Sequence, residues 1–303
     1  MAVREVRVSG LEYVALATRL LHRIRLADSQ AGQWEAADLQ WWWRQPRPSD
    51  EISQLFWVDD EGPVAAVILT DWGGAWGCDP LAVASVPAVP LAAIWARAME
   101  IVEALKLDQV ETLVRDDDVE LRRLATGSGF ALAGDSSTFC CMDAEQRPDV
   151  AVLADGFTLV DRSQEMRLPH PMQQRNGPAM QTRLRQCSLY DPELDLAIRG
   201  TDGEVAGYAL FWCDPMTRVG LVEPMRVEEG YRRRGLARAM LTEGLNRLAG
   251  RGTRRLKVVY GSDVARSLYV GAGFQATSVS STYSRKSIAA NPSDRWPRPD
   301  GGN

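Results

Sequence analysis

Hydrophobic positions recur along the chain with two periods, one typical of helices and one typical of strands. Apolar residues return every three or four positions in several segments, which predicts helices there. Short alternating or continuous apolar runs bounded by turn residues predict strands. The expected helices cover 11–26, 34–44, 91–105, 119–124, 236–248 and 267–274, and 163–186 is expected to hold helical material interrupted by Pro169-His170-Pro171. The expected strands cover 3–8, 52–59, 63–70, 81–86, 110–115, 137–142, 157–160, 195–199, 205–212, 219–227, 255–260 and 276–284.

These elements occur twice in the same order. Each half contains a hairpin, a strand, a long helix, a strand, a short helix that ends in Gly-Phe, and a final strand. The segments LRRLATGSGFALAG (121–134) and ARSLYVGAGFQATS (265–278) place that ending at the same point. We therefore predict an α/β (α+β) chain with two domains. Its expected parts are 1–145, a linker at 146–156, a second domain at 157–286, and a disordered tail rich in Pro, Gly and Asp at 287–303.

The stretch after the strand 219–227 holds the clearest candidate binding site. The sequence Arg232-Arg233-Arg234-Gly235-Leu236-Ala237-Arg238, here called the phosphate loop, leads from a turn into the helix 236–248. A glycine lets the backbone turn tightly and approach a ligand. The first helical turn offers unpaired N–H groups at the positive end of the helix dipole, and arginines add forked donors that suit phosphate. The pattern predicts a pyrophosphate site.

Two motifs in this region resemble those of one protein family. Arg232-x-x-Gly235-x-Ala237 is similar to the Gln/Arg-x-x-Gly-x-Gly/Ala motif of the GCN5-related N-acetyltransferases (GNAT). Residues 264–274, VARSLYVGAGF, are similar to the family's second signature, Ala-x-x-Leu-Tyr-x-x-x-Gly-Phe. The resemblance covers about residues 157–286. It implies a mixed, mostly antiparallel central sheet flanked by helices, and acetyl-coenzyme A (acetyl-CoA) as cosubstrate.

The resemblance extends loosely to the whole chain, because tandem members with one degenerate half occur in this family, as in mycothiol synthase. The long helix of the first half follows SVPAVP, residues 85–90, which contains Pro87 and Pro90 and no arginine. Proline removes a backbone donor, so this segment is not expected to hold a diphosphate. Only the C-terminal half is expected to bind the cosubstrate.

The resemblance also assigns expected roles to residues. Backbone amides of the strand before the phosphate loop would bind the pantetheine arm and the thioester carbonyl. Tyr269 stands at the tyrosine that in many members protonates the coenzyme A sulphur; the alternative is a packing residue. Asp263 replaces a common asparagine, and a carboxylate cannot donate the expected hydrogen bond. The expected cofactor-binding residues are Met225, Arg226, Val227, Arg232, Arg233, Arg234, Gly235, Leu236, Ala237, Arg238, Asp263 and Tyr269.

Glu223 is the candidate general base. It lies in an apolar run on the strand that leads to the phosphate loop, and a carboxylate in such surroundings is costly unless it is paired or used. Glu223 also shares strand parity with Val227, a count that a β-bulge would alter. The alternatives are a salt bridge, for example with Arg226, and substrate recognition without proton transfer.

The totals restrict the class of protein. A net charge of −5 argues against a nucleic-acid binder, although RRRGLAR is a local basic cluster. The five cysteines form no Cys-x-x-Cys pair and no metal is expected. An odd cysteine count without a framework, and no apolar run long enough to span a bilayer, predict a cytoplasmic protein. We expect a monomer or homodimer.

One further sequence feature is the triplet Trp41-Trp42-Trp43. It predicts either the end of a helix that packs on a core, or an aromatic wall facing an acceptor or the other half. The leading functional hypothesis is an acetyl-CoA-dependent N-acetyltransferase, catalysed by the C-terminal half with Tyr269 and Glu223, that acts on a primary amine of a small-molecule acceptor. The alternative is a non-catalytic acyl-CoA sensor whose first half binds a partner.

Overall fold

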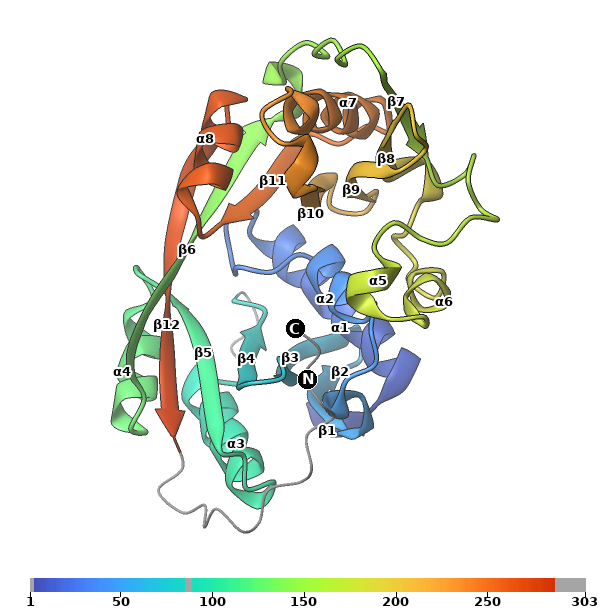
Figure 1. Cartoon of the computed structure of the whole chain (residues 1–303). Coiled ribbons are helices and arrows are strands. Elements are labelled where there is room, and N and C mark those ends of the chain that lie inside the picture. The colour runs from blue at the N-terminus through green and yellow to red at the C-terminus, as the bar shows by residue number, and fades with distance from the viewer. Residues whose placement is uncertain (1–2, 85–88, 287–303) are drawn as a thin grey trace.

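The computed structural model describes residues 3–84 and 89–286, and these form one continuous twelve-stranded sheet flanked by helices (Figure 1). The strand order is β1-β2-β3-β4-β5-β12-β6-β11-β10-β9-β8-β7, and most neighbours are antiparallel. The parallel pairs are β4 with β5 and β10 with β11. The strands are β1 Arg4–Val8, β2 Gln54–Asp59, β3 Gly62–Asp71, β4 Trp76–Ala82, β5 Gln109–Arg115, β6 Ala131–Asp143, β7 Phe157–Asp161, β8 Asp195–Gly200, β9 Val205–Asp214, β10 Val219–Val227, β11 Arg255–Tyr260 and β12 Gln275–Lys286.

The structure confirms most of the predicted helices. The segment 163–186, predicted as helical material interrupted at 169–171, contains two short helices, both after this interruption and separated by residues 177–179. The α-helices are α1 Gly10–Ala27, α2 Ala36–Trp42, α3 Leu91–Ala104, α4 Val119–Gly127, α5 Gln173–Asn176, α6 Met180–Leu184, α7 Leu236–Gly250 and α8 Asp263–Gly271. No described helix is long and apolar enough to cross a membrane.

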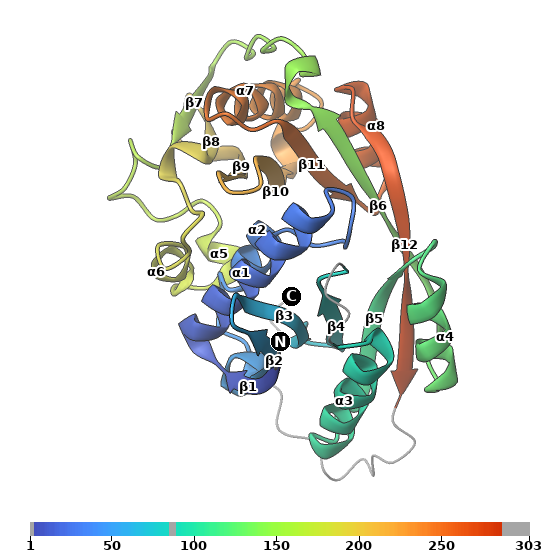
Figure 2. The same ribbon diagram turned by 180° about the vertical axis from the view of Figure 1, so that it is seen from behind.

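The two halves exchange their last strands. β6, from the N-terminal half, pairs along its end with β11 of the C-terminal half, and β12, from the C-terminal half, pairs with β5. β6 and β12 also pair with each other and run along one side of the molecule in both views (Figures 1 and 2). Each half therefore needs a strand of the other to complete its sheet.

Three apolar cores hold this arrangement together. One lies under α3 and α4 in the N-terminal half, and a second lies under α7 and α8 in the C-terminal half. The third surrounds α1 and α2, which lie between the two halves (Figures 1 and 2). In β9, Tyr208, Leu210 and Trp212 face this central core while Ala209 and Phe211 face α7, the two-residue period of a strand buried on both faces. The central core joins the halves into one unit.

Helix α7 lies close on β9. A Cβ atom at Gly244 would stand 2.0 Å from Cζ of Phe211, so only glycine allows this approach. Burial of Leu241, Leu245 and Leu248 on the same side fixes the axis of the helix over the sheet. The N-terminus of α7 is thereby held beside the end of β10.

Two predicted strands were placed wrongly. β4 begins at Trp76, inside the glycine-rich segment that predicted a turn, and ends at Ala82, while Val86 lies outside the described residues. β6 begins at Ala131, six residues before the predicted start. Its first six residues are exposed, because this part of β6 pairs with β12 away from the cores, so it carries no hydrophobic period. The predicted tail 287–303 lies outside the described residues.

Candidate active site

The strands β10 and β11 are paired only at their beginnings. The parallel register joins Val219–Leu221 with Arg255–Lys257 and stops there. Beyond this point β11 continues on β6 and β10 continues on β9. Within the described residues, the edge of β10 after Leu221 therefore has no strand partner on its β11 side.

The backbone of β10 changes direction at Glu223. One extra residue stands between Val222 and Met225 relative to β9, which is a β-bulge. The prediction that Glu223 and Val227 face the same side of the strand, which rests on their spacing in the sequence, is therefore wrong. After the bulge, the amide of Glu228 donates to the carbonyl of Ala206 at 2.9 Å.

That bond fixes the direction of the neighbouring amides. Strand amides alternate between the two edges, so the amide of Arg226 is directed to β9 like that of Glu228. The amides of Met225 and Val227 are directed to the open edge beside β11. Of the three amides expected to bind the cosubstrate, these two have the required direction.

The phosphate loop has the backbone expected of an anion site. Gly235 is the N-cap of α7 with φ +76°, and Arg233 has φ +64°. The backbone is therefore in the left-handed conformation at two nearby residues. The Ala239 amide donates to the Gly235 carbonyl at 3.1 Å as the helix begins, which leaves the amides of Leu236, Ala237 and Arg238 without intrahelical acceptors. An added Cβ at Gly235 meets nothing within 4 Å. The space in front of the turn is open.

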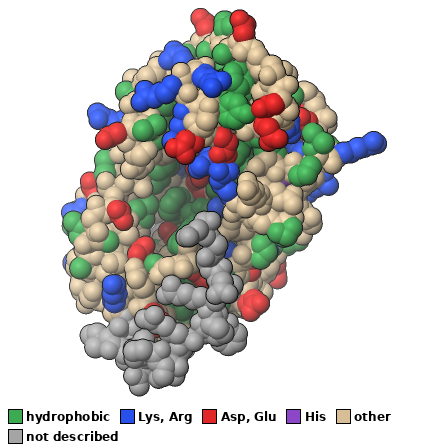
Figure 3. Space-filling model, viewed as in Figure 1, with side chains coloured by type: hydrophobic (Ala, Val, Ile, Leu, Met, Phe, Trp, Pro, Cys, Tyr) green, Lys and Arg blue, Asp and Glu red, His purple; other side chains and the backbone are tan. Residues whose placement is uncertain are grey.

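The arginines of the loop are exposed. Arg234 lies over the rings of Phe157 and Tyr231, at 5.9 and 5.7 Å from their centroids. Arg238 donates to the carbonyl of Gly271, at the end of α8, over 3.4 Å. Basic side chains also gather on the upper part of the face in Figure 3, above a hollow between the two halves. Cationic side chains beside an α-helix N-terminus favour binding of a polyanion.

Glu223 lies where β10 leaves β11, and the residue is half-buried. Burial, together with the nearby carboxylate of Asp38, raises the pKa of Glu223 to about 7, against the lowering effects of Arg44 and of a hydrogen bond from Trp41. The indole Nε1 of Trp212 donates to the Glu223 carbonyl at 2.8 Å and fixes the backbone. Arg226, the predicted alternative partner, pairs instead with Glu228 at 3.4 Å.

The groups around Glu223 come from the N-terminal half. Asp38, Trp41 and Arg44 lie on α2 or just after it, and α2 contacts both β9 and β10. Burial raises the pKa of Asp38 to about 6 although Lys257 lowers it. Sequence reasoning missed Asp38 and Arg44. The nearby tryptophan triplet was the only signal, and the structure gives it both expected positions: it ends α2 in the central core, and the Trp43 Nε1 donates to Gln186 of the other half at 3.0 Å.

Tyr269 lies on α8 and is 7% exposed. Its ring packs edge-on against Phe274, with centroids 6.0 Å apart. Burial raises the pKa of the Tyr269 phenol, and the charge of Glu223 raises it further. The phenol therefore keeps its proton at neutral pH and shares an electrostatic environment with the candidate base. No hydrogen-bond partner of its hydroxyl is found among the described residues.

Asp263 is the first residue of α8 and is exposed, with Ser262 as N-cap.

The two histidines have structural partners. His170 Nε2 lies 2.7 Å from Asp195 Oδ2 in a buried pair, and His22 Nε2 lies 2.9 Å from Asp214 Oδ2. No cluster of three possible metal ligands is found within residues 3–84 and 89–286.

The N-terminal counterpart of the phosphate loop is SVPAVP, residues 85–90. Residues 85–88, the larger part of SVPAVP, lie outside the described residues. Helix α3 begins directly after Pro90, its N-cap. The expectation that this segment holds no diphosphate stays a prediction.

Comparisons with known proteins agree with this geometry. Residues 161–274 match the family model described as the Acetyltransferase (GNAT) family. A tandem GNAT protein from the clavulanic acid biosynthesis pathway is similar in structure, with a TM-score of 0.68 at 14% identity over 96% of this chain and 100% of that chain. A GCN5-related N-acetyltransferase from Sphaerobacter thermophilus is also similar, with a TM-score of 0.60 at 17% identity over 93% and 95%. A search of curated protein sequences found no match.

Residues 161–274 therefore form an acetyltransferase domain of the GNAT family. The chain as a whole has the tandem GNAT fold.

Proposed function

We propose that the C-terminal half transfers the acetyl group of acetyl-CoA to a primary amine of a small-molecule acceptor. One observation carries the proposal: the carboxyl group of the half-buried Glu223, with a pKa raised to about 7, lies at the open edge of β10, on the strand that leads to the phosphate loop. A group with such a pKa is suited to accept a proton at neutral pH.

The residues of this half fit acetyl-CoA. Open space in front of Gly235 and the free amides of the first turn of α7 suit a diphosphate, and Arg232, Arg233 and Arg234 supply positive charge. The amides of Met225 and Val227 face the edge along which the pantetheine arm would lie. Asp263 is exposed but offers only an acceptor. Bound acetyl-CoA supplies an activated acyl group as a thioester.

The chain's own groups then have distinct tasks. Glu223 accepts a proton from the acceptor ammonium group, because an amine attacks only when it is neutral. The Met225 and Val227 amides donate hydrogen bonds toward the acyl oxygen as charge develops there. The Tyr269 phenol donates its proton to the departing sulphur. Asp38 and Glu223 together favour a cationic acceptor at the α2 side of the site.

The proposal includes a cytoplasmic location, since all five cysteines are unpaired and such thiols suit a reducing compartment. The direct test is a screen of small amines for acetyl-CoA-dependent release of free coenzyme A, with mass spectrometry of the acetylated product. Turnover of at least one primary amine is expected. Binding of acetyl-CoA without turnover of any amine would favour the acyl-CoA sensor instead.

Glu223→Gln is expected to lower kcat by about 10²–10⁴-fold, because it removes the base while it keeps the shape of the side chain. The base works only when deprotonated, so the wild-type rate should rise with pH through about 7 and then level off. When kcat is measured from pH 5 to 9, the variant should not show this rise near pH 7. Glu243→Gln, which alters an ion pair with Arg247 on α7, is the control. A raised KM with unchanged kcat in Glu223→Gln would indicate that Glu223 recognises the substrate and does not transfer a proton.

Tyr269→Phe is expected to lower kcat by about 10–10²-fold with little change in affinity for acetyl-CoA, because only the proton donor is lost. The ring contact with Phe274 remains. Tyr283→Phe, on β12 beside the N-terminal core, is the matched control. Stopped-flow or steady-state release of coenzyme A checks the prediction. An unchanged kcat would mean that Tyr269 is a packing residue.

A further inference from the structure

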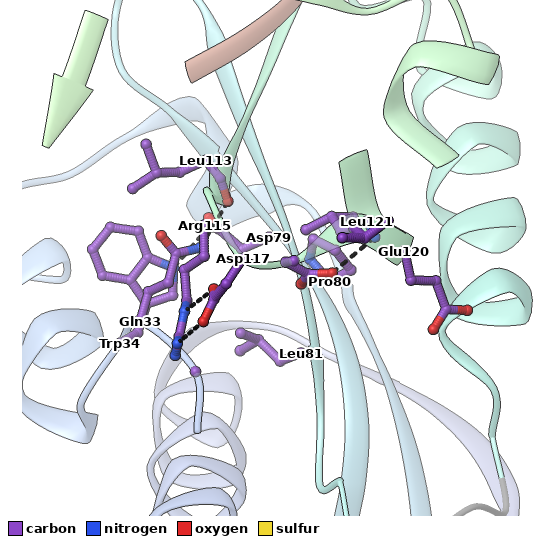
Figure 4. A pocket seen from close by; sticks show the side chains of 13 residues that line it. Gln33, Trp34, Asp79, Pro80, Leu81, Leu113, Arg115, Asp117, Glu120 and Leu121 are labelled. Carbon is purple, nitrogen blue, oxygen red and sulfur yellow. Dashed lines mark hydrogen bonds and ion pairs between the residues drawn. The ribbon is translucent and has the colours of Figure 1, made fainter. Parts of the chain in front are cut away.

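The N-terminal half contains a cavity of its own, of about 470 Å³. It lies between β4, β5, the start of α4 and the loop before α2 (Figure 4). Trp34 and Gln33 stand on one side, Leu121 of α4 stands on the other, and Arg115 and Asp117 lie between them (Figure 4). This volume is in the range of small-molecule sites.

The position of the cavity corresponds to the open edge of β10. β4 and β5 are parallel and pair only at Trp76–Gly77 with Val110–Glu111, then diverge. Asp79-Pro80 follows this pairing in β4 at the same distance as Glu223-Pro224 follows it in β10. Both halves therefore place an acidic residue before a proline where the two parallel strands separate.

Asp79 is the central group of the N-terminal cavity. It lines the cavity and is 8% exposed. Its Oδ1 accepts a hydrogen bond from Trp34 Nε1 at 2.9 Å, and no partner of Oδ2 is found among the described residues. Burial raises the pKa of Asp79 to about 6, with only the Trp34 bond acting against it. A largely buried carboxylate whose second oxygen has no protein partner is stabilised by a cationic or donor ligand.

Gln33 closes one side of the cavity. Its Nε2 donates to the carbonyl of Leu113 at 2.7 Å. Its Oε1 is buried, so this oxygen is not accessible from the cavity. The cavity thus presents the carboxylate of Asp79 as its acceptor, together with apolar walls from Leu81, Leu113 and Leu121.

The charges around the cavity oppose a phosphate ligand. Asp117, Asp118 and Glu120 line it in addition to Asp79, against the single cation Arg115. Asp117 already pairs with Arg115 at 2.6 Å. The N-terminus of α4 is capped by Asp118, whose carboxylate accepts from the Leu121 amide at 2.9 Å. A carboxylate already lies at the helix end, and the guanidinium is already paired, so both are unfavourable for a further anion.

We propose that the N-terminal half binds a small aliphatic primary ammonium ion in this cavity, with Asp79 as its counter-ion. The ammonium group would donate to Asp79 Oδ2, and the alkyl part would lie against the leucines. Acetyl-CoA, a polyanion, is excluded by the surrounding carboxylates. The site is separate from the proposed catalytic site and does not depend on turnover there.

The experiment is an NMR titration of the full chain with ¹⁵N-labelled tryptophan. The indole N–H signal of Trp34, assigned with Trp34→Phe, reports on Asp79 directly because the two are hydrogen-bonded. The probe is n-butylammonium and the neutral comparison is 1-pentanol. We expect a saturable shift of the Trp34 signal with n-butylammonium and none with 1-pentanol.

Two variants test the site. Asp79→Asn keeps the acceptor for Trp34 and should weaken binding by at least about tenfold. Leu113→Phe should block the cavity by volume, whatever the charge at Asp79. Equal shifts with 1-pentanol, or unchanged affinity in both variants, would overturn the proposal. In Gly235→Glu, displacement of n-butylammonium by acetyl-CoA would also overturn it and would identify an acyl-CoA slot.

Discussion

Gly235→Glu is expected to abolish binding of acetyl-CoA by the C-terminal half. The new carboxylate would enter the open space in front of the first turn of α7, where the diphosphate is proposed to lie. Two like charges about 4 Å apart repel by about 4 kcal/mol at an effective dielectric constant of about 20. That energy corresponds to a loss of about 10²–10³-fold in affinity.

Isothermal titration of acetyl-CoA into the intact chain checks this result. The wild type should bind one molecule per chain, because only the C-terminal half has the phosphate loop. Two molecules per chain would mean that the N-terminal half also binds the cosubstrate. An unchanged affinity in Gly235→Glu would remove the argument for the phosphate loop.

Gly252→Glu separates the effect of charge from that of backbone strain. Gly252 follows α7 at its other end, has φ +82° and has nothing within 4 Å of an added Cβ. A left-handed glutamate there costs about 1–2 kcal/mol, as at Gly235. The two variants should therefore lose similar stability, while only Gly235→Glu loses affinity for acetyl-CoA.

The sequence predicts the C-terminal site well because its determinants are local. The strand β10, the left-handed Gly235 and the start of α7 follow one another within about twenty residues, and β10 and β11 were predicted with their observed bounds. Hydrophobic period and glycine position are sufficient signals for such a unit. The match of residues 161–274 to the GNAT family has the same origin.

The relation between the halves could not be predicted in the same way. The pairing of β6 with β11 joins residues more than a hundred positions apart, and no local pattern encodes which strand lies beside which. The groups around Glu223 were missed for a similar reason. Asp38 and Arg44 lie on an N-terminal helix, and only the central core brings them to β10. The bulge before Met225 likewise has no signature in the residues.

A buried ion network fixes α2 in that position. Glu35, the N-cap residue of α2, accepts from Arg25 of α1 at 2.6 Å and from Lys257 of β11 at 2.9 Å. The side chains of all three residues are 5% exposed. Lys257 is also the last residue of β11 that pairs with β10. The network therefore joins the N-terminal half to the point where the two parallel strands diverge.

Glu35→Ala is expected to lower the free energy of unfolding by about 3–5 kcal/mol, because it leaves two buried cations without their common partner. Urea unfolding followed by near-ultraviolet circular dichroism measures the change. Glu5→Ala removes an exposed pair with Arg97 and should cost no more than about 1 kcal/mol. Equal decreases in the free energy of unfolding in the two variants would contradict a stabilising role of the buried network.

The pH dependence gives a second, independent check of the same network. Burial raises the pKa of Glu35, but Lys257 and Arg25 outweigh it, and the folded-state pKa lies below the ordinary value. The stabilisation is thus present above the ordinary pKa and is lost as pH falls through the lower, folded-state value. The difference in free energy of unfolding between the wild type and Glu35→Ala should therefore become smaller as the pH is lowered. Burial and Asp38 of α2 raise the pKa of Glu223 more than Arg44 and Trp41 lower it, so a displacement of α2 away from β10 in Glu35→Ala should also move the rise of the pH–rate profile to lower pH.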